Sequence, residues 1–116
     1  MIGESGDSRL PAHLEIAAIR RLAEAQGGDA MVLSKGERDA GTIALLTIDR
    51  EHNAQFYERM PRMDGTRGWT RVEPKDIENE QQFSEYCARR SQSDPDLWIL
   101  EVSVSDPARF IESLPV

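Results

Sequence analysis

The segment TIALLTI, at residues 42–48, restricts the fold more than any other part of the sequence. Alternate side chains of a strand point to opposite faces of its sheet. Both alternating sets are largely apolar here, with Ile43 and Leu45 in one set and Ala44, Leu46 and Ile48 in the other. A strand with two apolar faces lies inside a sheet that is covered on both sides. The chain is therefore predicted to build a sheet with helices over at least part of both faces.

A second strand is predicted within SDPDLWILEVSVSDP, residues 93–107, where two Asp-Pro pairs flank an apolar run. Proline disfavours helical geometry at the residue before it, so Pro95 separates this run from the preceding helix. Residues 97–104 are then predicted to form a strand. One of its faces carries Trp98, Leu100, Val102 and Val104, and the other carries Leu97, Ile99, Glu101 and Ser103. Asp106 followed by Pro107 is typical of a helix N-cap and first helical position. Folding requirements thus explain this stretch without a catalytic role.

Periodicity and breaking residues predict the other elements. They are a helix at 10–26, strands at 30–34, 54–60 and 68–73, a helix from the N-cap Asp76 to about 90, and a short helix ending near 114. The loop KGERDAG after the first strand has a glycine near each end and is predicted to close a hairpin. The fold class is α+β, in the order α-β-β-β-β-α-β-α, with a mostly antiparallel sheet of about five strands. A flexible tail at 1–8 precedes a single domain at 9–116.

Charge and composition exclude some classes of function. The chain has 116 residues and a formal net charge of −7, which disfavours binding to nucleic acid. Its one cysteine, Cys87, cannot form an intrachain disulfide and suits a reducing compartment. The first eight residues lack the basic and apolar stretches of a secretory signal, and no apolar run approaches the ~20 residues of a membrane helix. We therefore expect a soluble cytoplasmic protein.

Positive charge gathers in RMPRMDGTRGWTR, residues 59–71. Guanidinium groups bind phosphate or carboxylate through two parallel hydrogen bonds, and an indole adds a stacking face. The predicted anion-binding residues are Arg59, Arg62, Arg67, Arg71 and Trp69. In the alternative interpretation, these arginines pair with carboxylates of the chain such as Glu58, Asp64 and Glu73. This interpretation is favoured because runs of charged residues are usually solvated surface.

Two acidic groups are weighed as metal sites, and neither is predicted to be one. Asp49, Glu51 and His52 carry suitable oxygen and nitrogen ligands, but adjacent residues of a turn generally diverge. Asp94 and Asp96 fit a turn and a cap better than a magnesium site.

Two further residues are weighed as catalytic groups. Glu15 falls on the apolar arc of the first helix. Three interpretations are considered for it: a position at the rim of the arc, an ion pair with an arginine, and an acid or base of shifted pKa. Cys87 has no histidine in its window EYCARR and has aromatic neighbours, which favours a small core residue over a nucleophile. The sequence contains no nucleophile elbow, CxxC, HExxH or Gly-rich phosphate loop, so no catalytic residue, cofactor or metal is predicted.

Three segments resemble a family of short bacterial proteins described only as a domain of unknown function and found mainly in alphaproteobacteria. The segments are IRRLAEAQGGDAMVLSKGERDAGTI, FYERMP with the following GWTRV, and DPDLWILEV. Together they extend over most of residues 9–104. The resemblance implies a compact α/β domain in a bacterial cytoplasm, and it supplies no catalytic residue because the family has no established activity.

The functional hypotheses follow from these observations. The first is a non-enzymatic binding or protein-interaction domain. The second is a protein or enzyme that binds a small phosphorylated or carboxylated molecule through the arginines of residues 59–71. A nucleic-acid binder ranks last, because those arginines would have to outweigh the negative charge of the whole chain.

Overall fold

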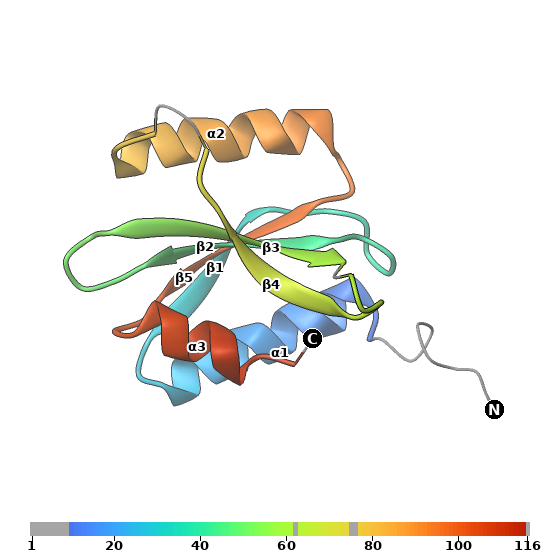
Figure 1. Cartoon of the computed structure of the whole chain (residues 1–116), viewed down its shortest axis with the longest axis horizontal. Helices are drawn as coiled ribbons and strands as arrows, with labels where there is room; N and C mark the ends of the chain where they lie inside the picture. Colours follow the sequence, from blue (N-terminus) through green and yellow to red (C-terminus); the bar gives the residue numbers. More distant parts are fainter. Residues whose placement is uncertain (1–9, 62, 75–76, 116) are drawn as a thin grey trace.

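The computed structural model describes residues 10–61, 63–74 and 77–115 (Figure 1). Within these residues, three helices and five strands follow one another in the predicted order. They are α1 (Ala12–Ala25), β1 (Asp29–Ser34), β2 (Ile43–Ile48), β3 (Ala54–Pro61), β4 (Arg67–Val72), α2 (Glu80–Ser93), β5 (Trp98–Ser103) and α3 (Pro107–Ser113).

The five strands form one mixed sheet in the spatial order β1-β5-β2-β3-β4. Three of the neighbouring pairs are antiparallel, and the central pair, β2 with β5, is parallel. Figure 1 shows α2 on one side of the sheet and α1 with α3 on the other. The predicted α+β domain with a mostly antiparallel sheet is therefore confirmed, and the sheet is covered by helices on both faces.

The two faces of the sheet carry two separate layers of core. All six residues of β2 are buried, as the sequence predicts for a central strand. Ile43 and Leu45 pack with the apolar side chains of α1 and α3, whereas Leu46 packs on the other face with Cys87 of α2. The side chains of β5 divide in the predicted way, with Trp98, Leu100, Val102 and Val104 in the first layer and Leu97 and Ile99 in the second.

The predicted hairpin of the first two strands is wrong, because β5 lies between β1 and β2. The loop KGERDAG instead crosses the start of β5. The indole nitrogen of Trp98 donates a hydrogen bond to the Glu37 carbonyl at 2.6 Å. A Cβ atom at Gly36 would lie 2.2 Å from the carbonyl oxygen of Asp96, so glycine is required by close approach of two backbones. The glycines of this loop thus allow a crossing where a tight turn was expected.

The N-terminus of α2 also differs from the prediction. The helix begins at Glu80, and the side chain of Asn79 accepts a hydrogen bond from the backbone N–H of Gln82 at 2.9 Å. The predicted cap, Asp76, lies outside the described residues, and the helix starts later than predicted because Asn79 caps it by accepting from one of its first free N–H groups.

The predicted cap of the last helix is confirmed. The side chain of Asp106 accepts from the N–H of Arg109 at 3.2 Å, and Pro107 begins α3. Over residues 10–61, 63–74 and 77–115, no helix has both the length and the apolar character that crossing a membrane requires.

Candidate functional site

Arg59, the first of the predicted anion-binding residues, is a buried structural group. Its guanidinium pairs with the carboxylate of Glu15 on α1, and only 6% of its side chain is exposed. The same guanidinium lies over the ring of Trp69, 4.6 Å from the ring centroid, because Arg59 and Trp69 are cross-strand partners in β3 and β4. The Nε of Arg59 and the indole nitrogen of Trp69 are buried and make no hydrogen bond to any described residue. The pair therefore ties α1 to β3, next to the edge strand β4. Of the interpretations considered for Glu15, the structure shows the ion pair with an arginine.

The other predicted arginines do not converge with Arg59 on one space. Arg67, Trp69 and Arg71 alternate along β4 and so share one face of the sheet. Arg71 is exposed and pairs with Glu73 at 3.4 Å, as the alternative interpretation proposes. Arg67 is half-buried and has no ion pair within the described part of the chain, and Arg62 lies outside that part. Anion binding by this set stays a prediction.

Glu58, another carboxylate named as a partner for these arginines, has a different partner. It accepts two hydrogen bonds from Arg90 of α2, at 2.6 and 2.8 Å. The Glu58 carboxylate raises the pKa of the Arg90 guanidinium above its ordinary value. This pair fastens α2 to β3 in the same way that Glu15 and Arg59 fasten α1.

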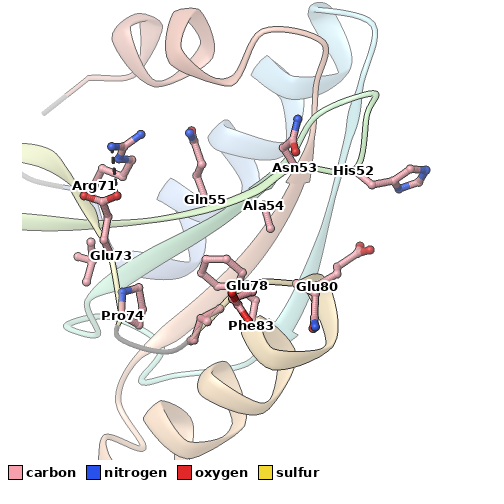
Figure 2. A pocket seen from close by; sticks show the side chains of 13 residues that line it. His52, Asn53, Ala54, Gln55, Arg71, Glu73, Pro74, Glu78, Glu80 and Phe83 are labelled. Atoms are coloured by element: carbon pink, nitrogen blue, oxygen red, sulfur yellow. Dashed lines mark ion pairs between the residues drawn. The ribbon is translucent and has the colours of Figure 1, made fainter.

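Arg71 lines an open cleft of about 340 Å³ at the start of β3, which we call the Arg71 cleft (Figure 2). The wall also carries the carboxylates of Glu73, Glu78 and Glu80 and the exposed imidazole of His52. Amide side chains and the ring of Phe83 complete it, and Figure 2 shows the Arg71–Glu73 pair and His52 at opposite ends. Its size suits a small molecule. Three carboxylates against one guanidinium favour a ligand that carries positive charge.

The acidic residues weighed as metal ligands hold loops together. One carboxylate oxygen of Asp49 accepts from the N–H groups of Glu51 and Asn53, each at 2.9 Å, and the hydrogen bond from Asn53 lowers the pKa of Asp49. Asp94 accepts weakly from the N–H of Asp96 at 3.3 Å. Within residues 10–61, 63–74 and 77–115, no three His, Cys, Asp or Glu side chains form a group that could hold a metal ion.

Cys87 is buried on the face of α2 that packs on the sheet. Burial raises the pKa of its thiol to about 11, so the thiolate is scarce at neutral pH. The interpretation of Cys87 as a core residue agrees with this environment.

An exposed apolar edge of the sheet is the feature that sequence reasoning missed. β1 stands last in the strand order, and no strand of the described residues pairs with its outer edge, which we call the β1 edge. Met31 is 55% and Leu33 is 38% exposed, although Ala30 and Val32 pack against the core. No charged residue or proline lies between Asp29 and Lys35. Proteins commonly protect edge strands with such residues, and β4 at the opposite edge carries Arg67 and Arg71.

A hollow of about 380 Å³ adjoins this edge and is called here the β1–α2 hollow. Leu33 and Ser34 form one side, and small side chains of α2 form the other, namely Ser84, Cys87, Ala88 and Ser91. The Ser34 hydroxyl donates to the Ser91 hydroxyl at 2.7 Å, which fixes the distance between strand and helix. Because these side chains are small, the hollow has room for an apolar side chain from outside the described chain.

Acidic groups border the same edge. Glu101 of β5 lies opposite Met31 of β1 in the ladder. Its burial raises the pKa of its carboxyl, and the negative charges of Glu80 and Asp29 raise it further. The neighbourhood of Met31 therefore favours a positively charged group.

Comparisons with known proteins place the chain within one group. Residues 10–112 match the family model described as "Protein of unknown function (DUF1491)". A crystal structure of a DUF1491 family protein from Caulobacter crescentus is 31% identical, with a TM-score of 0.78, covering 93% of this chain and 99% of that one. An NMR structure of a DUF1491 family protein from the same organism is 32% identical, with a TM-score of 0.74 and coverage of 92% and 96%.

A solution structure of a protein from A. tumefaciens is similar in fold, with 22% identity, a TM-score of 0.72 and coverage of 89% and 92%. No curated protein matches the chain. The predicted resemblance to an alphaproteobacterial family of unknown function is confirmed by these matches.

Proposed function

Because this chain belongs to the DUF1491 family, whose function is unknown, we propose a function from its own surfaces: a small cytoplasmic, non-enzymatic domain that binds another polypeptide through the β1 edge. The observation that carries this proposal is the exposure of Met31, 55%, on an edge strand that has no charged residue between Asp29 and Lys35. An apolar strand with a free edge is the surface to which extended segments add in many peptide-binding domains.

The backbone of β1 supplies the first part of the interaction. Among the residues that the structure describes, β1 pairs only with β5, so alternate N–H and C=O groups point away from the sheet. An added strand would form a ladder with these groups. Such a ladder supplies affinity to any sequence of suitable shape, and side chains supply selectivity.

The side chains of β1 supply the second part. Complete burial of a methionine or leucine side chain stabilises a complex by about 1.5–3 kcal/mol. The exposed parts of Met31 and Leu33 therefore offer roughly 1 kcal/mol each to a partner that covers them. The β1–α2 hollow adds a cavity beside Leu33 for a side chain of that partner.

Hydrogen exchange tests the proposal at the level of single segments. We expect amide exchange in residues 29–34 to be slower in protein taken from cells as a native complex than in dilute purified protein. Residues 67–72 of β4 provide the internal control and should exchange equally in both samples. The Met31→Lys/Leu33→Lys variant should lose the protection, whereas Met63→Lys, at an exposed methionine remote from β1 in sequence, should retain it. Equal exchange of residues 29–34 in both samples would contradict the proposal.

A second candidate function is favoured by the Arg71 cleft. We propose that its ligand would be a small molecule with a carboxylate for Arg71 and an amine for the surrounding glutamates. A ligand at 100 times its dissociation constant raises the free energy of unfolding by about 2.7 kcal/mol, which a thermal-shift screen of amino acids, organic acids and nucleotides detects. Arg71→Ala should abolish the shift, and Arg67→Ala should preserve it because Arg67 does not line the cleft. An equal shift in both variants would exclude this site.

A further inference from the structure

We propose that the polypeptide bound at the β1 edge is an extended segment that carries a lysine or arginine at one end and apolar side chains at the other, all turned towards α2. This inference rests on the proposed function and states the chemistry of the partner. It is drawn from the order of charged and apolar groups along β1 and the neighbouring side of α2.

The ladder with β5 shows which side chains of β1 lie on the face of the sheet that α2 covers, called here the α2 face. Residues directly opposite each other in an antiparallel ladder have side chains on the same face. Met31 lies opposite Glu101, whereas Ala30 and Val32 pack in the core layer of α1. Because side chains alternate along a strand, Asp29 shares the α2 face with Met31 and Glu101.

A bulge keeps the α2 face occupied at the other end of β1. The register with β5 is irregular just before Ser34, which lies opposite Ile99 of the α2 layer. Leu33 and Ser34 both line the β1–α2 hollow. The α2 face of β1 therefore presents a carboxylate first, at Asp29, then the apolar Met31, and finally Leu33 beside the hollow.

Three carboxylates lie near the Asp29 end of this surface. Asp29 and Glu101 are on the α2 face, and the charge of Glu80 on α2 acts on Glu101. None of the three has an ion pair within the described part of the chain. The negative charges of Glu80 and Asp29 add to the effect of burial in raising the pKa of the Glu101 carboxyl. A cation from a partner would relieve this repulsion.

The Leu33 end of the surface favours apolar side chains. Leu33 is 38% exposed, and no charged residue lines the β1–α2 hollow beside it. A charged side chain of the partner would lose hydration there without gaining a counter-ion. An apolar side chain would instead be removed from water and fill the space between the small side chains of α2.

The spacing of a strand matches this order of groups. In an added strand, every second side chain points to the α2 face. The residue opposite Asp29 would be basic, and the residues opposite Met31 and Leu33 would be apolar. Because neighbouring strands lie about 4.8 Å apart, Glu101 on β5 is about 10 Å from the added strand. The long side chains of lysine and arginine suit this separation better than histidine does.

Designed peptides with blocked ends test the pattern. Leu-Thr-Val-Thr-Lys and the reverse order are both used, because an added strand can lie antiparallel or parallel to β1. In an NMR titration of the purified chain, we expect at least one of them to shift the amide signals of residues 29–34 and to leave those of residues 67–72 in β4 unchanged. Glutamate in place of lysine should weaken binding at least about fivefold. Exchanging the lysine with its neighbouring threonine should also weaken binding, because the lysine then points to the opposite face.

Charge reversal on the protein is the matched test. Glu101→Lys and Asp29→Lys should each bind the glutamate peptide more tightly than the lysine peptide. Glu112→Lys makes the same change in net charge at an exposed position of α3 and should keep the preference for lysine. Ser84→Phe fills the β1–α2 hollow, so it should weaken both peptides and leave the preference for lysine intact. Circular dichroism establishes that each variant is folded.

The outcomes separate the chemistry of the partner from the function. Equal affinity for the lysine and glutamate peptides, binding of neither, or the same preference in Glu101→Lys and Glu112→Lys would overturn the inference. Slower exchange of residues 29–34 in complexes from cells would still support the interaction function in that case. Equal exchange of these residues in both samples rejects the function, whichever peptide binds in the titration.

Discussion

The carboxylate of Glu15 pairs with the guanidinium of Arg59, 44 residues further along the chain. The two groups are 16% and 6% exposed, and the ring of Trp69 covers the guanidinium. The guanidinium of Arg59 is thereby occupied in joining α1 to β3. Its burial and its ion pair leave it little room to bind an anion from solution.

We predict that Glu15→Ala lowers the free energy of unfolding by about 3–5 kcal/mol, because it leaves the buried Arg59 without a counter-ion. The double variant Glu15→Met/Arg59→Met should lose less than Glu15→Ala, since no isolated charge remains buried. Urea denaturation measures both values, with Glu24→Ala at an exposed position of α1 as the control. A loss of less than about 0.5 kcal/mol for Glu15→Ala would show that this pair does not stabilise the fold.

We predict slow alkylation of Cys87 in the folded protein, because burial keeps its thiol protonated with a pKa of about 11. Iodoacetamide near pH 8 should label it far more slowly than it labels the same chain in urea, as measured by the mass increase. In a Cys87→Ala background, Ala88→Cys places a thiol at an exposed position of the same helix and should react quickly. Equal labelling of Cys87 in the folded and unfolded chain would contradict its assignment to the core.

We predict that Glu101→Gln raises stability near neutral pH. The pKa of Glu101 is raised in the folded protein by burial and by the charges of Glu80 and Asp29. The folded state therefore binds a proton more tightly than the unfolded state, so this group makes the protein more stable as pH falls through the raised pKa towards the ordinary value. The Gln variant should lose this part of the pH dependence, whereas Glu112→Gln at an exposed position should keep it. Unfolding by urea at several pH values measures the difference, and an unchanged pH profile for Glu101→Gln would refute it.

Much of the fold is predictable because burial is encoded locally. The segment TIALLTI is apolar at both alternating sets, and all of β2 is buried. The alternation that starts at Trp98 likewise assigns each side chain of β5 to the correct face. These patterns depend only on the two-residue period of a strand. They therefore predict which side chains are buried, whatever the order of the strands in the sheet.

The strand order is not local, and here the prediction fails. Two apolar runs joined by a short loop with Gly36 and Gly41 resemble a hairpin, but the same glycines allow the loop to cross β5. Nothing within 30–48 shows that a strand 50 residues later inserts between the two, because that choice is made by packing across the whole domain. The exposure of the β1 edge was not predicted for the same reason, because an apolar strand at the edge of a sheet has the same amino-acid composition as a buried strand.

Amide exchange along the two edge strands tests the central claim, that the β1 edge binds a polypeptide, most directly. In complexes taken from cells, we predict slower exchange in residues 29–34 than in dilute purified protein, with no difference in residues 67–72 of β4. Equal exchange of residues 29–34 in the two samples, or equal slowing at both edge strands, would contradict the account.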